Sequence, residues 1–237
     1  MHPGLSGQWT SRPDWHSAQL PRRTLQRQSS LPRDHAPVSV PLETLRPTQM
    51  AVGMRTVTTK RRKLETRACK RKQLEKLLLT RPIPAVKGPD GDLYIIDHHH
   101  FGLALWQAEI DYAFAQIIDD LSTLSYGAFW RRMESDGRLY PFDEDGRRVS
   151  PQRLPPELAA LRHDPFRDLA SDVKAAGGYR KVATPYAEFH WANFFRRHIA
   201  STLIRNDRRQ SLRQALKLCR SPEARGLPGY IAPAAGK

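Results

Sequence analysis

The stretch Asp92–Leu105, DLYIIDHHHFGLAL, places three consecutive histidines between two apolar runs. The apolar residues before them, with residues 83–86 and the intervening GPDG, predict a β-hairpin. The apolar run after them predicts a helix that begins near Phe101. Residues 97–100, called the DHHH corner below, therefore lie between a strand and a helix. Helix N-termini present free backbone N–H groups and the positive end of the helix dipole, which suit a phosphate.

The side chains of the DHHH corner suggest phosphate chemistry. Backbone N–H groups of His99, His100, Phe101 and Gly102 are candidates to cradle a phosphate. The rings of His99 and His100 are candidates to donate to it, and to act as general acid or base near neutral pH. Asp97 is a candidate to orient a histidine or to hold Mg²⁺ or another divalent metal. Successive residues of a strand point to opposite faces, so at most two histidines could ligate one transition metal ion.

The charge of the chain is strongly positive and concentrated at its two ends. The 237 residues carry a formal net charge of +15. Residues 1–81 contribute +12, residues 82–204 contribute −3, and residues 205–237 contribute +6. Basic flanks favour polyanions, so the expected partner is a nucleic acid or a nucleotide. The sequence does not predict an oligomeric state.

Cysteine usage and hydropathy indicate a cytoplasmic protein. Cys69 and Cys219 are far apart and neither belongs to a Cys-x-x-Cys motif, which suggests a reducing compartment and rules out a four-cysteine zinc site. No run approaches the roughly 18 apolar residues of a membrane helix. The first 15 residues lack the apolar core of a secretory signal, so no membrane partner is expected.

Periodicity and composition divide the chain into three predicted parts. Residues 1–36, rich in Pro, Ser, Arg and Gln, are predicted to be disordered. Residues 37–135 alternate strand and helix patterns, including a basic helix over residues 60–80. Residues 136–237 begin with a turn-rich segment and continue as helices packed on the preceding domain. The aromatic residues of the stretch 184–204 are expected mainly in the core.

Two sets of residues resemble a known family. VSVPLETLRPTQ (residues 38–49), followed by a basic helix and IPAVKGPDGDLYIIDHHHFGLAL (residues 83–105), resembles the N-terminal domain of ParB-like proteins. Relatives of that domain include sulfiredoxin and a group of free-serine kinases. The downstream DPFRDLA, GGYRK and PYAEFHWANFFR resemble the ParB-like nuclease branch. The resemblance implies an α+β fold, a ParB/sulfiredoxin-like small mixed sheet with flanking helices, plus a C-terminal helical extension.

The resemblance also implies a site that handles nucleotide or nucleic-acid phosphate, with ATP, ADP or CTP as possible nucleotides. Glu43 is a candidate second carboxylate by resemblance to the kinases. Lys60 and Arg61 begin the predicted basic helix and are candidates to contact a phosphate tail. The candidate catalytic residues are Asp97, His99, His100 and Glu43; the candidate phosphate-binding residues are His98, Phe101, Gly102, Lys60, Arg61, Thr48 and Gln49; the candidate metal ligand is Asp97.

Two departures from the family pattern limit what is carried over. His98 stands where the family has glycine, and Phe101 stands where it has the arginine that holds nucleotide phosphates in partition ParB proteins, so a CTP clamp is not expected. Sulfiredoxin chemistry requires a cysteine at the corner. Cys69 and Cys219 lie elsewhere in the sequence, so this chemistry is not expected. Three functions remain: a ParB-like nuclease or related phosphate-handling enzyme, a nucleotide-dependent small-molecule kinase with Glu43 as base, and a non-enzymatic nucleic-acid-binding adaptor.

Overall fold

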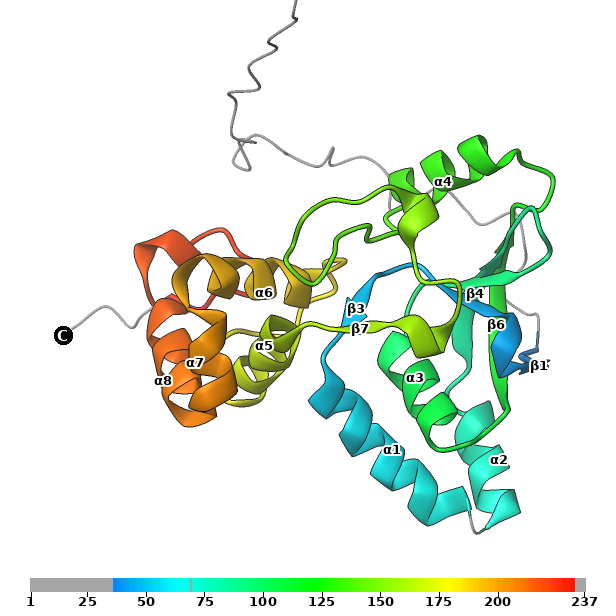
Figure 1. Cartoon of the computed structure of the whole chain (residues 1–237), viewed down its shortest axis with the longest axis horizontal. Coiled ribbons are helices and arrows are strands. Elements are labelled where there is room, and N and C mark those ends of the chain that lie inside the picture. The colour runs from blue at the N-terminus through cyan, green and yellow to red at the C-terminus, as the bar shows by residue number, and fades with distance from the viewer. Residues whose placement is uncertain (1–35, 69, 233–237) are drawn as a thin grey trace, which may run out of the picture.

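A five-stranded mixed sheet forms the centre of the N-terminal half. The computed structural model describes residues 36–68 and 70–232, so the segment predicted to be disordered lies outside them except for Ala36. The sheet has the strand order β1-β6-β4-β5-β2. Its strands are β1 (Val38–Pro41), β2 (Leu45–Pro47), β4 (Ile83–Lys87), β5 (Leu93–Ile95) and β6 (Tyr112–Asp120). Pairs β1–β6 and β4–β5 are antiparallel, whereas β4–β6 and β2–β5 are parallel. The α+β class with a small mixed sheet is confirmed (Figure 1).

The predicted β-hairpin and the corner after it are both present. Strands β4 and β5 pair antiparallel, and the turn between them includes Gly91 with φ of +85°. A left-handed backbone of this kind favours glycine. Strand β5 ends at Ile95, and helix α3 (His99–Gln107) begins directly after His98. The DHHH corner is therefore the link between the second strand of the hairpin and a largely buried helix.

The predicted basic helix is two helices. Helix α1 (Met54–Ala68) begins six residues before the predicted start, and helix α2 (Arg71–Leu79) follows it. The predicted helix ran across residue 69, which is outside the described residues. Each helix buries a narrow apolar stripe, which consists of Val57 and Leu64 in α1 and of Leu74 and Leu78 in α2. The remaining surface of both helices is mostly solvated.

Helices dominate the second half of the chain. These are α4 (Tyr126–Ser135), α5 (Pro165–Ala175), α6 (Ala187–His198), α7 (Ser201–Asn206) and α8 (Arg208–Leu218). A short parallel pair, β3 (Ala51–Val52) with β7 (Arg162–His163), lies between the main sheet and α5–α8 (Figure 1). The stretch 184–204 contains two helices, α6 and α7. No helix within the described residues is long and apolar enough to cross a bilayer.

Two large apolar clusters stabilise the fold. The first joins the main sheet to α1, α2 and α3 and still includes Leu158 and Leu161. The second lies among α5–α8 and contains Trp191, Phe194 and Phe195, so these aromatic residues are in the core as expected. The change from one cluster to the other falls between Leu161 and Phe166. The turn-rich segment after residue 135 thus contributes Leu158 and Leu161 to the first cluster, and the domain boundary at residues 135/136 stays a prediction.

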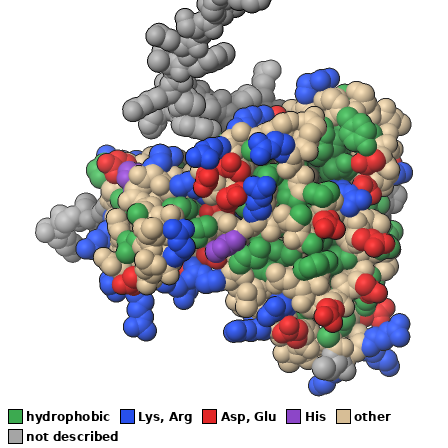
Figure 2. Space-filling model, viewed as in Figure 1, with side chains coloured by type: hydrophobic (Ala, Val, Ile, Leu, Met, Phe, Trp, Pro, Cys, Tyr) green, Lys and Arg blue, Asp and Glu red, His purple; other side chains and the backbone are tan. Residues whose placement is uncertain are grey.

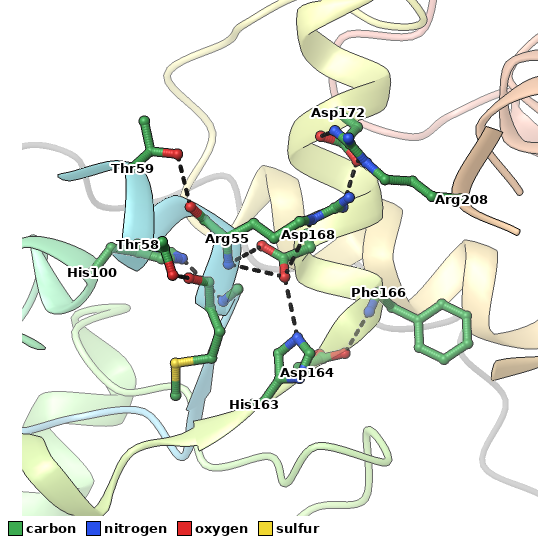
Figure 3. Close-up of polar contacts among 12 residues, drawn as sticks. Arg55, Thr58, Thr59, His100, His163, Asp164, Phe166, Asp168, Asp172 and Arg208 are labelled. Carbon is green, nitrogen blue, oxygen red and sulfur yellow. Dashed lines mark hydrogen bonds and ion pairs between the residues drawn. The ribbon is translucent and has the colours of Figure 1, made fainter. Parts of the chain in front are cut away.

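A polar junction connects the start of α1 to α5 (Figure 3). The buried Asp168 carboxylate accepts the backbone N–H of Arg55 at 3.1 and 3.2 Å, and His163 Nε2 lies 3.1 Å from it. Arg55 Nη2 reaches Asp172 at 2.5 Å, and Arg208 also contacts Asp172. A carboxylate at a helix N-terminus satisfies free N–H groups and interacts favourably with the helix dipole. Asp168 therefore caps a helix that lies more than a hundred residues earlier in the chain.

We predict that Gly53→Ala destabilises the protein, because a Cβ at Gly53 would overlap the Asp168 carboxylate. Overpacking of this kind costs about 1–3 kcal/mol. The control is Gly127→Ala in α4, where the new Cβ meets only the mobile end of Arg131 and alanine is the better helix former. Urea unfolding of both variants measures the effect. Equal stability of the two variants would contradict the close approach of Asp168 to α1.

Candidate functional site

A cavity of about 410 Å³ opens beside the DHHH corner. This volume lies within the range of roughly 300–1,000 Å³ that is typical of ligand pockets. One wall comes from the corner and from Gln49. The other comes from α5, from the start of α6, and from the segment between them. The lining residues with polar or aromatic side chains are Gln49, Asp97, His99, His100, Arg167, Lys174, Tyr179, Arg180, Lys181, Thr184, Tyr186, Glu188 and Phe189.

The rings of His99 and His100 accept hydrogen bonds from the backbone. His99 Nε2 accepts the N–H of Thr48 at 3.1 Å, and His100 Nε2 accepts the N–H of Gly53 at 3.1 Å. A nitrogen that accepts carries no proton, so each neutral ring has its hydrogen on Nδ1. These two contacts attach the segment between β2 and α1 to the first turn of α3.

Burial keeps both rings neutral. Desolvation, with a further contribution from the charge of Arg167, lowers the pKa of His99 to about 3. The same two causes, in the same order, hold the pKa of His100 well below its usual value. A general acid works best when its pKa is near the working pH. The structure therefore favours positioning roles for these two rings over the proton-transfer roles expected from the sequence.

The backbone of the corner is largely satisfied within its own turn. His98 has a φ of +65°, and its N–H donates to Asp97 Oδ1 at 2.6 Å. The N–H groups of Phe101 and Gly102 both donate to the His98 carbonyl at 2.8 Å. They are engaged in the first turn of α3 and are not presented to the cavity. A Cβ at Gly102 would press against Leu158, so close packing accounts for this glycine.

Arg167 is a buried cation on the cavity wall. It is 6% exposed, and its guanidinium lies 3.4 Å from the centroid of the Phe189 ring. Its Nε and Nη1 atoms are buried and have no hydrogen-bond partner among the described residues. Burial lowers the pKa of Arg167, and the nearby Glu188 and Asp164 act in the opposite direction. Buried arginine is normally paired, so two unpartnered nitrogens on a cavity wall indicate a place for an anion.

The other charged groups of the cavity are predominantly basic. Lys174 forms an ion pair with Glu188, and both side chains are about 30% exposed. Arg180 and Lys181 are exposed at the cavity, as is Asp97 at the corner. Four basic side chains thus share the cavity with two carboxylates, one of which is already paired.

The structure brings only some of the predicted site residues to the cavity. Asp97, His99, His100 and Gln49 line it. Thr48 lies behind His99 and donates to the Ile95 carbonyl at 2.8 Å. Seven predicted residues do not line the cavity: Glu43, Thr48, Lys60, Arg61, His98, Phe101 and Gly102. Of these, Glu43 is exposed in the 3-10 turn Leu42–Thr44 and Lys60 is half-buried in α1. Arg61 forms an ion pair with Glu65.

Sequence reasoning missed the contribution of α5 and α6. Arg167 and Lys174 are seven residues apart, which places them on the same face of α5. Arg167 also lies among the buried positions of that helix, next to Phe166 and Ala170. An arginine within an apolar stripe, with a lysine two turns later, is the signal that could have identified this wall.

The cavity side chains could hold a metal ion only if a bound ligand supplied further oxygen atoms to it. No three His, Cys, Asp or Glu side chains come together as a metal cage within residues 36–68 and 70–232. Mg²⁺ at phosphate sites is commonly held by one or two carboxylates, substrate oxygens and water. Asp97 fits that kind of site, because it is exposed and lines the same cavity as Arg167.

We predict that His99 makes stability depend on pH. Its pKa is about 3 in the folded chain and 6.5 in the unfolded chain. Below pH 6.5 only the unfolded chain takes up this proton, so the free energy of unfolding falls by up to about 1.4 kcal/mol per pH unit. Above pH 6.5 this contribution stays constant. Urea unfolding at pH 7.5, 6 and 5 measures it.

His99→Gln is the matched variant, because glutamine keeps an acceptor near the Thr48 N–H but does not titrate. The wild type should be more stable than His99→Gln at pH 7.5, and the difference should shrink towards pH 5. A difference that stays constant over this range would contradict a neutral, buried His99.

Comparison with known proteins extends over both halves of the chain. Residues 38–197 match the family described as "Putative ParB-like nuclease", a range that includes the corner and Arg167. The crystal structure of protein Atu1540 from Agrobacterium tumefaciens is similar, with a TM-score of 0.75 and 37% sequence identity over 83% of this chain and 98% of that one. No curated protein matches. Because the family match spans more than half of the sequence, the chain belongs to the ParB-like nuclease family.

Proposed function

We propose that the chain binds a phosphate group of a nucleotide or nucleic acid in the cavity beside the DHHH corner, with Arg167 as the main positive charge. The observation that carries this proposal is the buried guanidinium of Arg167, whose Nε and Nη1 have no partner among the described residues. Hydrogen bonds between arginine and phosphate are charge-assisted and about twice as strong as neutral ones. A bound phosphate would supply the missing acceptors, and its charge would add to the compensation that Glu188 and Asp164 already provide.

The remaining groups of the cavity support a phosphorylated ligand. Lys174, Arg180 and Lys181 add positive charge around the anion position. Because the rings of His99 and His100 are neutral, the buried positive charge on the cavity wall belongs to Arg167. The two rings would help to form the wall against which a ligand packs. Tyr186 and Phe189 present aromatic surface to the same cavity, which suits the base or sugar of a nucleotide.

Phosphodiester hydrolysis is the reaction that we assign to this site. Positive charge stabilises the charge that develops on the phosphoryl oxygens in the transition state. Asp97 is the carboxylate best placed to hold Mg²⁺ against the phosphate, and the metal would supply an activated water molecule. A kinase that uses Glu43 as base has less support, because Glu43 does not line the cavity.

We predict that Arg167→Met abolishes anion binding and yet stabilises the ligand-free protein. Replacing buried charged groups with well-packed apolar side chains of similar volume is often neutral or stabilising, by about 1–4 kcal/mol. Thermal unfolding with and without pyrophosphate, ADP, ATP or CTP measures both effects. The wild type should gain stability with at least one of these anions, whereas the variant should start higher and gain nothing.

Arg153→Met is the control, because Arg153 is exposed outside the cavity. It should respond to the anions as the wild type does. An equal response of Arg167→Met and the wild type would contradict the role of Arg167, and so would a variant that is less stable without ligand.

We further predict that Asp97→Asn reduces cleavage at least tenfold and leaves pyrophosphate binding intact, because a neutral amide holds a divalent metal poorly. The assay incubates purified protein with labelled single- and double-stranded DNA and RNA in Mg²⁺ or Mn²⁺. Asp111→Asn, an exposed carboxylate outside the cavity, is the control. Hydrolysis is contradicted if no substrate is cleaved by the wild type, or if both variants cleave at the wild-type rate.

A further inference from the structure

The two helices α1 and α2 form a strongly basic surface, called the basic elbow below (residues 54–81). It contains eleven Lys and Arg residues and two Glu residues. Eight of the basic residues are exposed: Arg62, Lys63, Arg67, Lys70, Arg71, Lys72, Lys76 and Arg81. Figure 2 shows Lys and Arg side chains, with Asp and Glu side chains among them, along the lower edge of the molecule, where α1 and α2 lie in Figure 1.

Among residues 36–68 and 70–232, few carboxylates balance the charge of the basic elbow. In the described part of the chain, the ion pairs of these helices join Arg55 to α5 and Arg61 to Glu65, and none involves the eight exposed residues. Elsewhere arginines are commonly paired, as Arg138 is with Asp119 and Arg196 with Asp164. Like charges on neighbouring helices repel one another, so the elbow has a net repulsion that a polyanion would relieve.

The basic elbow lies next to the DHHH corner, because α1 packs against α3, which begins at that corner. Lys60 is half-buried in α1, where burial and the charges of Arg81 and Lys63 lower its pKa while Asp97 raises it. The charges of Lys60 and Arg81 also act on His98, in the DHHH corner. Asp97 and His100 of that corner line the cavity. The basic elbow, the corner and the cavity are thus electrostatic neighbours.

We propose that the basic elbow binds the phosphate backbone of a nucleic acid and thereby presents one of its phosphates to the cavity. The repeated phosphates of a nucleic acid match a surface with many separate cations, whereas a single nucleotide could engage only a few of them. This proposal rests on the proposed phosphate site and narrows its substrate from nucleotides in general to a nucleic acid. The contacts would be independent of base sequence, because they involve only the backbone.

The test measures the affinity for a labelled 20-base-pair duplex by fluorescence anisotropy between 50 and 300 mM NaCl. The test variant replaces Arg67, Arg71 and Lys72 with glutamine. The control variant replaces Arg209, Arg213 and Lys217 of α8 with glutamine, which removes the same charge from exposed positions on the opposite side of α5 from the corner. Each lost phosphate contact should reduce the slope of log affinity against log salt by about 0.9.

The elbow variant should bind at least tenfold more weakly at 100 mM NaCl, with its slope reduced by about two to three units. The α8 variant should remain within threefold of the wild type. Equal losses in the two triple variants would overturn the proposal, since binding would then reflect net charge alone. Absence of binding by the wild type, or binding to vesicles that contain phosphatidylserine in preference to the duplex, would also overturn it.

A further measurement separates this proposal from the phosphate site. The elbow variant should keep the stabilisation by pyrophosphate, because its three substitutions lie on α1 and α2 and outside the cavity. If pyrophosphate does not stabilise the wild type, the phosphate site in the cavity is contradicted. If the elbow variant loses duplex affinity and the α8 variant does not, nucleic-acid binding by the elbow is supported. The two failures therefore have different signatures.

Discussion

Two backbone N–H groups, those of Thr48 and Gly53, donate to the neutral rings of His99 and His100. These hydrogen bonds fix the segment between β2 and α1 against the start of α3, about fifty residues away in sequence. A protonated ring would lose its acceptor and repel Arg167, so the contacts require both imidazoles to stay neutral. The position of Gly53 in turn places the start of α1 against Asp168. The cavity wall, the corner and the junction of the two halves all depend on this arrangement.

The parts of the fold that follow from local sequence were predictable. The hairpin before the corner follows from its alternating strands and the turn GPDG, and the start of α3 follows from the apolar run after His98. The early start of α1 was not predictable, because its cap is Asp168, far along the chain. Local patterns carry no information about a cap of that kind, which exists only after α5 has packed.

The sequence predicted the strand-to-helix corner correctly, and the function of its residues stays a prediction. The corner lines a cavity, and Asp97, His99 and His100 all reach it. The positive charge that favours an anion comes from Arg167 on α5, which lies far from the corner in sequence. The left-handed backbone of His98 gives a physical reason for the glycine that the family resemblance implies at this position, because glycine adopts a positive φ without strain.

The cap that Asp168 places on α1 limits how such a protein can change over evolutionary time. A fragment that ends before α5 would lack both this carboxylate and the guanidinium on the cavity wall, so the start of α1 and the cavity both require α5. Insertions are tolerated most easily in exposed turns such as that around Gly91, which leave the junction untouched. Recombination between relatives should therefore preserve α1 and α5 as a matched pair, even though more than a hundred residues separate them.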